Sequence, residues 1–362
     1  MSVCRFFVVW VVAGSVLAGC SSSGSKTSAT TGTTAARAPV SATTTTVAQR
    51  QVAAQPSAGC VQHTVMAGAQ TGAFDARGVR GSYISQMPAD AVVGKPLPVV
   101  FDLHGYEEPG PVQAAMSTLG AYGQTHGFVT VTPSIDDRPV PSWLATVGSA
   151  DMAWFGDLLT HVEATECVDE HRVFVAGISN GAAMASAVAC QFSSRVAAVA
   201  PVSGMQADAQ CKATRPVPVV AFHGTADPVL HYDGTPSEGA AALLGLSGSG
   251  TLTAQQAKLL GLQGALTQGP AIPQRAAAWA KRNGCSATER TTRIAGDVTL
   301  LAWSCPNDAD VELFRVSGGG HTWPGSQLAV STARIAGRTT FSISADAEMW
   351  RFFEAHPLRP SD

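Results

Sequence analysis

A serine near the middle of the chain stands where an exposed nucleophile would be expected. Ser179 lies at the centre of the pentapeptide Gly177–Gly181 (GISNG), which follows the apolar run 172–176 and precedes the alanine-rich run 182–190. Runs of these lengths predict a strand and then a helix, so the serine falls in a sharp turn between them. Glycines on either side let the backbones approach closely while the hydroxyl stays exposed. The pattern therefore favours nucleophilic attack by Ser179 on an acyl group.

A serine hydroxyl needs an imidazole to accept its proton and usually a carboxylate to orient that imidazole. When the nucleophile sits in a strand–turn–helix, the chain order is serine, acid, histidine, each after a strand. We predict His321 as the base, because it follows the expected strand 311–316 through three glycines. His223 and His356 are interpreted as structural, and His231 is the alternative base.

The predicted acid is Asp227. It lies just past the apolar run 218–222, in the sequence FHGTADP, and between the serine and the histidine. Asp233 and Asp208 are the alternatives, of which Asp208 follows an earlier strand. An aspartate in such a loop can also serve only to form a turn.

Acyl transfer also requires two fixed N–H donors for the oxyanion that forms during attack. The backbone amide of Asn180, the first residue of the expected helix, is the predicted first donor. The second is expected from the loop after the His-Gly pair at 104–105, most simply the amide of Tyr106. That pair could instead form only a tight strand exit. Trp143 and Trp323 would line an aromatic pocket or belong to the core.

The elements that must position these residues alternate along the chain. The expected strands are 79–85 at an edge, 97–103, 128–132, 172–176, 196–202, 218–222, 298–303 and 311–316. The expected helices are 112–126, 151–165, 182–190, 274–282 and 345–355. Continuous apolar strands separated by helices are typical of an α/β fold, a mostly parallel central sheet with helices on both faces.

The section 233–272 departs from this alternation. It contains Gly-rich patches and a short helical stretch at 254–260. We interpret it as a surface insertion over the carboxyl edge of the sheet. There it would either shape a pocket or form a plain loop.

The chain begins with one positive charge, a short apolar stretch and the sequence Leu-Ala-Gly-Cys that ends at Cys20. This is typical of an export signal over 1–19 rather than of a membrane span. Its ending resembles a bacterial lipobox, which makes Cys20 the predicted lipidation site; an ordinary signal peptide is the alternative. Residues 20–58, rich in Ser, Thr and Ala, are predicted to be a disordered tether, and 59–362 a single catalytic domain.

Eight cysteines are present, and Cys4 and Cys20 belong to the N-terminal signal region. The other six fit three disulfides in an exported domain, with about 15 connectivities open. We favour Cys190 with Cys211 and Cys285 with Cys305, which close short loops, and this leaves Cys60 with Cys167. No close pair of cysteines accompanies histidines at zinc-ligand spacing, so neither a metal nor a cofactor is expected.

The distribution of charge excludes one class of partner. Four of the 23 Lys and Arg residues lie before residue 59, whereas all 26 Asp and Glu residues lie after it, so the expected domain carries a net charge of −7. Nucleic acid is therefore not an expected partner. The expected partners are an ester substrate and, through the lipid, a membrane. The sequence carries no signal for an oligomeric state.

Four motifs together resemble the secreted polyhydroxybutyrate-depolymerase-like and feruloyl-esterase-like branch of the α/β-hydrolases. They are Leu103–Gly105 (LHG), Gly177–Gly181 (GISNG), Phe222–Pro228 (FHGTADP) and Gly319–Gly325 (GGHTWPG). The resemblance extends over roughly residues 60–355. It implies an α/β-hydrolase fold, a triad of Ser179, Asp227 and His321, and an exported lipoprotein of the actinobacterial type.

The sequence departs from the family after the His-Gly pair, where Tyr106–Pro109 (YEEP) adds bulk and charge. We therefore expect a soluble ester, an acylated or feruloylated polysaccharide or a short oligomer as the substrate, rather than a crystalline polyester. The resemblance implies a serine esterase, and a peptidase or an acyltransferase could use the same triad. A non-catalytic surface lipoprotein that binds glycans or a partner is the alternative of a different class.

Overall fold

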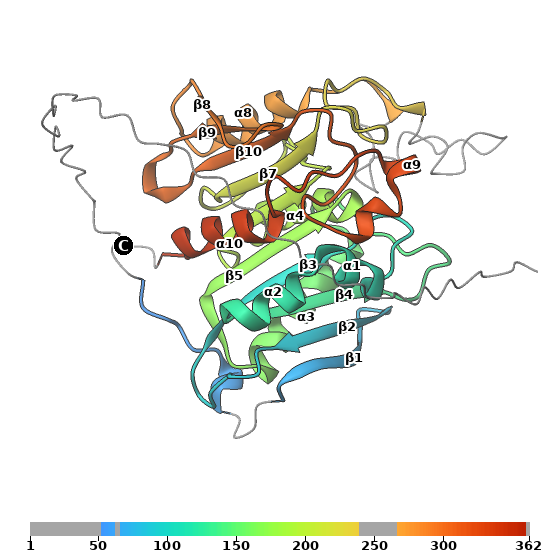
Figure 1. Cartoon of the computed structure of the whole chain (residues 1–362). Coiled ribbons are helices and arrows are strands. Elements are labelled where there is room, and N and C mark those ends of the chain that lie inside the picture. The colour runs from blue at the N-terminus through green and yellow to red at the C-terminus, as the bar shows by residue number, and fades with distance from the viewer. Residues whose placement is uncertain (1–51, 62–65, 239–265, 360–362) are drawn as a thin grey trace, which may run out of the picture. The chain divides into compact units, whose positions relative to one another are not determined.

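A single large sheet organises the described part of the chain. The computed structural model describes residues 52–61, 66–238 and 266–359. Its ten strands lie in the order β1-β2-β4-β3-β5-β6-β7-β10-β9-β8 (Figure 1). They are β1 (Gly68–Ala76), β2 (Val79–Met87), β3 (Leu97–Leu103), β4 (Val129–Ile135), β5 (Val168–Ile178), β6 (Ala198–Val202), β7 (Val219–Gly224), β8 (Arg290–Arg293), β9 (Val298–Trp303) and β10 (Val311–Val316).

The middle of this sheet is parallel and its two edges are antiparallel. From β4 through β3, β5, β6 and β7 to β10, each neighbouring pair runs in the same direction. The edge pairs β1–β2, β2–β4, β10–β9 and β9–β8 run in opposite directions. Because parallel strands end on the same side, the loops after β3, β5, β7 and β10 meet at one edge of the sheet.

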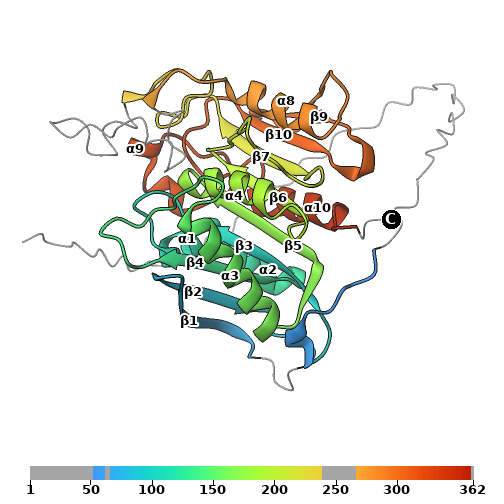
Figure 2. The same cartoon turned by 180° about the vertical axis from the view of Figure 1, so that it is seen from behind.

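Helices cover both faces of the sheet. They are α1 (Gly110–Ser117), α2 (Leu119–His126), α3 (Ala150–Thr165), α4 (Asn180–Gln191), α8 (Ile272–Arg282), α9 (Ala333–Ala336) and α10 (Ala345–Ala355). Helices α1, α2 and α10 lie on one face, and Figure 2 shows α3, α4 and α8 on the other. A separate apolar cluster fills the space under each group of helices. The strand order and two-sided cover are those of an α/β-hydrolase fold, which confirms the predicted class.

Residue types explain which elements lie deepest. Every residue of β4 and β7 is buried, as expected for central strands covered on both faces. Helix α4 is built almost entirely of small residues and is buried from Asn180 to Cys190. A helix that is apolar on all sides packs inside a protein, and small side chains let α4 lie close to the sheet.

The structure differs from the sequence-based expectation at three elements. The strand expected at an edge, 79–85, corresponds to β2, which pairs with the additional edge strand β1. At the other edge, β8 was also not expected. Both missed strands are largely exposed and lack apolar runs, so their pairing depends on a neighbouring strand. The single helix expected over 112–126 is two helices, since Thr118 between them adopts the left-handed conformation (φ 59°).

The folded region begins earlier than residue 59. Ser57 donates its backbone N–H to Val168 (2.9 Å), and the amide of Gln55 donates to Asp169 Oδ1 (2.8 Å). Pro56 forms an isolated antiparallel bridge with Asp169. Residues 52–58, assigned to the tether by sequence, therefore lie against the start of β5.

Three disulfides join the six cysteines in the favoured pairing, which confirms that prediction. They are Cys60–Cys167, Cys190–Cys211 and Cys285–Cys305. The first fixes the N-terminal segment to the start of β5, and the other two close short loops beside α4 and β9.

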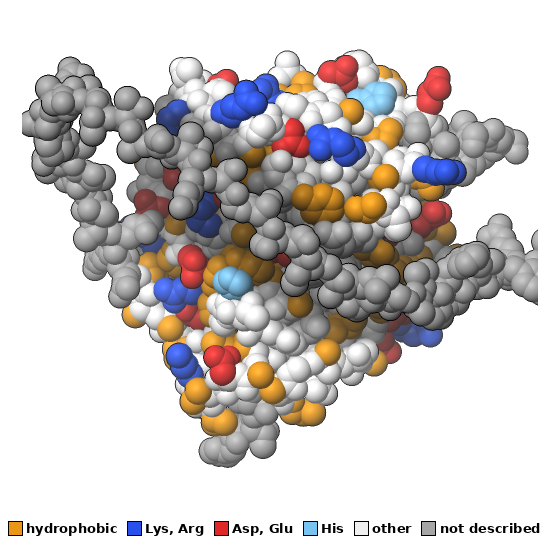
Figure 3. All heavy atoms as spheres, viewed as in Figure 1, with side chains coloured by type: hydrophobic (Ala, Val, Ile, Leu, Met, Phe, Trp, Pro, Cys, Tyr) orange, Lys and Arg blue, Asp and Glu red, His pale blue; other side chains and the backbone are white. Residues whose placement is uncertain are grey.

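Several predictions fall outside the described residues: the signal over 1–19, lipidation of Cys20, the tether before residue 52, and the helical stretch 254–260. Within the ranges that the structure does describe, no helix combines the length and apolarity needed to cross a membrane. On the face seen in Figure 3, acidic and basic side chains are interspersed and do not gather into one basic patch.

The buried carboxyl group of Asp102, at the end of β3, should make the stability of the fold depend on pH. Its carboxylate is fully buried and accepts hydrogen bonds from Gln113 Nε2 (2.6 Å) and Ser117 Oγ (2.5 Å). Burial is the main reason that its pKa is raised from 3.8 to about 7. Because the folded state favours the protonated form, ionisation favours unfolding, and stability is lost as the pH rises from about 4 to about 7.

Asp102→Asn removes this titration and keeps both neighbours hydrogen-bonded. We expect the variant to be more stable than the parent at pH 8, by on the order of 2 kcal/mol, and nearly equal to it at pH 4. Urea unfolding at the two pH values measures the difference. An equal effect at both would contradict the assignment.

Candidate active site

The predicted site residues come together at the carboxyl edge of the sheet. Ser179 directly follows β5, Asp227 follows β7 and His321 follows β10. The loop that contains Tyr106 follows β3. Residues up to 215 positions apart in the sequence are thus neighbours because parallel strands end side by side.

Ser179 sits in a strained turn that the adjacent glycines permit. Its backbone has φ 58° and ψ −116°, a conformation that side-chain-bearing residues rarely adopt. A Cβ at Gly177 would lie 2.7 Å from the backbone of Gly181, and one at Gly181 would lie 2.2 Å from the carbonyl oxygen of Leu103. The backbone amide of Ser179 donates to Val202 on β6 (2.9 Å). This geometry lifts the hydroxyl above the strand end and towards a cavity.

His321 and Asp227 form a direct pair. Nδ1 of His321 lies 2.8 Å from Oδ2 of Asp227. Two glycines allow their loops to meet, since a Cβ at Gly224 would lie 2.1 Å from the carbonyl oxygen of Gly319. That oxygen accepts the amide of Ala226 (2.9 Å). The glycine run before His321 thus serves close packing of two strand-end loops.

The two partners shift each other's pKa. Burial alone would raise the pKa of Asp227, but His321, His223 and the amide of Leu230 together hold it below its usual range. Burial would lower the pKa of His321, but Asp227, with a contribution from Glu108, raises it above the usual value. The arrangement favours an ionised Asp227 that stabilises a protonated His321, as proton uptake by the imidazole requires.

A second histidine, His223, contacts the same carboxylate, although sequence reasoning treated it as structural. Its Nε2 lies 2.8 Å from the carbonyl oxygen of Leu230 and 3.3 Å from Asp227 Oδ2. A carbonyl can only accept, so we assign the proton of the neutral ring to Nε2. Burial lowers the pKa of His223, which favours that neutral form. Val229 and Leu230 donate their amides to the other oxygen of Asp227, both at 2.8 Å.

The alternative residues lie in contacts of their own. His231 pairs with Thr235 through Nδ1 (2.9 Å), and Asp233 accepts the amide of the same threonine (3.0 Å). Asp208 accepts the amide of Gln210 (2.8 Å). Each is held within a local turn, and none of them contacts His321.

The loop expected to supply the second oxyanion donor is held by Trp143 and Asn180. Nε1 of Trp143 donates to the carbonyl oxygen of His104 (3.0 Å). The backbone of Trp143 pairs twice with the Asn180 side chain, as donor to Oδ1 (2.6 Å) and as acceptor from Nδ2 (3.0 Å). A Cβ at Gly105 would lie 3.6 Å from the Cβ of Ser179, so this loop closely approaches the nucleophile. Trp143 is fully buried and therefore belongs to the core.

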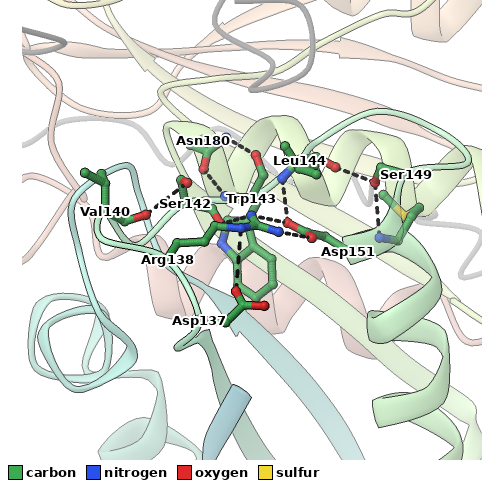
Figure 4. A network of polar contacts seen from close by, with 10 residues as sticks. Asp137, Arg138, Val140, Ser142, Trp143, Leu144, Ser149, Asp151 and Asn180 are labelled. Atoms are coloured by element: carbon green, nitrogen blue, oxygen red, sulfur yellow. Dashed lines mark hydrogen bonds and ion pairs between the residues drawn. The ribbon is translucent and has the colours of Figure 1, made fainter. Parts of the chain in front are cut away.

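A network in the loop after β4 fixes Trp143 in turn (Figure 4). The guanidinium of Arg138 forms a two-pronged pair with the fully buried carboxylate of Asp151 and donates to the carbonyl of Ser142 (2.9 Å). Asp151 Oδ2 also accepts the amide of Leu144 (2.7 Å). The carbonyl of Pro141 from the same loop accepts the amide of Glu107 (2.9 Å). The loops after β3 and β4 thus support each other.

Arg138→Gln would leave Asp151 buried without its cation. We expect the variant to lose about 3 kcal/mol of unfolding free energy, since breaking a buried ion pair leaves an uncompensated charge. Arg77→Gln, which breaks a surface pair with Asp157, is the matched control and should cost less than about 1 kcal/mol. Chemical denaturation measures both, and equal losses would show that the network does not act as a buried unit.

Ser179 and His321 line the same cavity, of about 240 Å³. Its surface is mostly apolar, and its polar side chains come from the loop after β3, from the serine turn and from the segment that contains His321. The lining residues are Gly105, Tyr106, Glu107, Glu108, Met116, Ile178, Ser179, Val229, His321, Thr322, Ala329, Thr332, Ile335 and Ala336. Glu107 and Glu108 were noted in the sequence only as an unusual charged run, and their place at the nucleophile depends on how the loop folds.

Comparison with known proteins gives several matches. Residues 81–238 match the family model described as esterase PHB depolymerase. The chain is 30% identical over 135 residues to a bifunctional acetylxylan esterase/xylanase of Neocallimastix patriciarum, covering 37% of this chain and 20% of that protein. It is 29% identical over 176 residues to feruloyl esterase B of Piromyces equi, covering 47% and 28%.

Among solved structures, the chain is similar to an acetyl xylan esterase from Aspergillus awamori. The sequence identity is 16%, the TM-score is 0.49, and the match covers 76% of this chain and 94% of that esterase. The chain spans less than a third of the two curated relatives. The segment 81–238, which matches the family model, contains the loop after β3, the serine turn and Asp227. By these matches, the segment 81–238 is similar to the esterase PHB depolymerase family, and the chain is similar in sequence to an acetylxylan esterase/xylanase and to a feruloyl esterase.

Proposed function

We propose that the chain is a serine esterase that hydrolyses carboxylic esters through an acyl-enzyme on Ser179. The observation that carries this proposal is the pairing of His321 with Asp227 (2.8 Å) beside a cavity that His321 and Ser179 both line. The serine supplies the nucleophile, the imidazole moves its proton, and the ionised carboxylate orients the imidazole.

The reaction proceeds in two halves. Ser179 Oγ attacks the ester carbonyl while its proton passes to Nε2 of His321, and the resulting oxyanion is stabilised by the amides of Asn180 and Tyr106. The C–O bond then breaks, and the alcohol leaves with the proton from His321. Water enters, gives a proton to His321 and attacks the acyl-enzyme. The carboxylic acid is released as the proton returns to Ser179.

The cavity supports a small acyl or aromatic group. Aliphatic side chains such as Met116, Ile178 and Val229 form most of its wall, and its volume of about 240 Å³ limits the size of the group. The names of the relatives mention acetylxylan and feruloyl esters. We therefore propose acetyl or feruloyl esters of polysaccharides, or short hydroxyacyl oligomers, as substrates.

We further propose that the protein acts outside the cytoplasm, anchored through Cys20 or secreted. Three disulfides in one domain are typical of oxidising compartments, and the N-terminal sequence has the pattern of a lipoprotein signal. In this proposal, residues 1–19 are removed, the following segment is a tether, and the α/β-hydrolase domain follows it.

The test is turnover of a matched substrate panel by the full chain. We expect hydrolysis of p-nitrophenyl acetate, butyrate and hydroxybutyrate and of methyl ferulate, and covalent labelling of Ser179 by a fluorophosphonate, located by mass spectrometry. Matched anilides and added sugar acceptors distinguish a peptidase or an acyltransferase. Folded protein that neither turns over any ester nor takes the label would refute the proposal and favour a binding protein.

A further inference from the structure

Glu108 places a carboxyl group at the wall of the cavity, next to the predicted oxyanion site. Its Oε2 accepts the backbone amide of Gly105 (3.1 Å), the residue before Tyr106. Glu108 lines the same cavity as Ser179, and its charge is felt by His321. The hydrogen bond from Gly105 therefore holds this side chain beside both the nucleophile and the base.

The cationic neighbour that the structure describes for this carboxyl group is His321, and only in its protonated form. Within the described part of the chain no Lys or Arg lies within ion-pair distance of Glu108, and none lines the cavity. Around it the walls are aliphatic, and burial raises its pKa. A half-buried acidic group in an apolar cavity carries a desolvation cost that an opposite charge would offset.

The position of Glu108 has a consequence for catalysis. During attack the substrate carbonyl becomes an oxyanion close to the amide of Tyr106, and an ionised Glu108 nearby would oppose that negative charge. A substrate that brings its own positive charge to Glu108 would remove this opposition. The benefit is largest in the transition state, so it raises the rate of the chemical step as well as binding.

We infer that Glu108 is a specificity-determining residue that selects esters with a positively charged group, such as a quaternary ammonium, a few bonds from the scissile carbonyl. Tyr106 also lines the cavity, and an aromatic side chain beside Glu108 would add a cation–π attraction for such a group. This inference rests on the proposed esterase activity and adds the charge class of the substrate to it.

Two isosteric substrate pairs test the inference. Acetylcholine and 3,3-dimethylbutyl acetate differ only in the charge of the alcohol. The p-nitrophenyl esters of 4-trimethylammoniobutyrate and 5,5-dimethylhexanoate differ only in the charge of the acyl group. We expect the parent protein to prefer the cationic member of at least one pair by about tenfold in kcat/KM, and the pair that responds identifies the side that Glu108 faces.

Glu108→Gln keeps an acceptor for the Gly105 amide and removes the charge. We expect kcat/KM for the cationic ester to fall about tenfold and kcat for its neutral isostere to rise about threefold. Glu289→Gln is the matched control, because this glutamate is exposed and does not line the cavity. It should keep most of the preference.

Several outcomes would overturn the inference: a parent protein without preference in either pair, a preference that survives Glu108→Gln, or an equal loss in Glu289→Gln. The preference of the parent protein is informative even if a variant folds poorly. Failure to hydrolyse the neutral esters at all would instead refute the esterase proposal, so the two failures are distinguishable.

Discussion

Ser179→Ala is expected to lower kcat for short p-nitrophenyl esters by about 10⁵-fold, because it removes the hydroxyl that forms the proposed acyl-enzyme. The fold should be unaffected, since alanine also carries a single Cβ at this strained position. Fluorophosphonate labelling should be lost completely. Rates at saturating substrate and intact-protein mass spectra measure the two effects.

Ser203→Ala is the matched control for this change. Ser203 also follows a strand, has a positive φ (47°) and is almost fully buried, but it does not line the cavity. Its hydroxyl has no hydrogen-bond partner in the described part of the chain, so its loss should change neither activity nor stability appreciably. If ester turnover persists in Ser179→Ala and disappears in Ser203→Ala, the assignment of Ser179 as the nucleophile is wrong.

Asp227→Asn should have the second largest effect, a fall in kcat of about 10⁴-fold. An amide at this position can donate to His321 Nδ1 and so favours the wrong tautomer of the imidazole. The change also moves the acidic limb of the pH profile. Because Asp227 raises the pKa of His321, the activity of the parent protein should rise with pH around a midpoint above the usual histidine pKa of about 6.5. In the variant, the residual activity should rise around a midpoint at lower pH than in the parent.

The measurement is kcat/KM against pH for both proteins, with Asp233→Asn as the control. Asp233 is exposed and bonds only within its own turn, so its replacement should leave both the rate and the acidic limb unchanged. A limb that does not move in Asp227→Asn would show that another group sets the pKa of the base. A large loss in Asp233→Asn would show that the acid is not Asp227.

Elements with strong local signals could be predicted from the sequence. The strands 298–303 and 311–316 and the helix 345–355 have the predicted bounds, since an apolar run or an amphipathic stripe marks each of them. The strand β1 could not be predicted in the same way, because its residues are half-exposed and it forms by pairing with β2. The break at Thr118 also escaped, since apolar spacing continues across it.

The candidate site divides along the same line. Ser179, Asp227 and His321 could be proposed because each follows a strand and has glycines beside it. Glu108 and the pairing of Trp143 with Asn180 could not, because each depends on how a loop without regular structure folds over the sheet. The sequence favours a structural role for His223, because it precedes the acid and lies at the tip of a different strand from His321. Its contact with Asp227 arises from a turn that brings Leu230 back to the strand end, and this turn has no marker in the sequence.

The attachment of residues 52–60 to the beginning of β5 determines where a mechanical load would act on the domain if the chain were anchored at its N-terminus. A pull transmitted from the N-terminus would first load the hydrogen bonds between residues 52–57 and the beginning of β5, and then the Cys60–Cys167 disulfide. Ser179 lies at the other end of that same strand of 11 residues, about 35 Å away. A covalent bond would thus bear the load at one end of β5, while the catalytic turn lies at the other end of the strand.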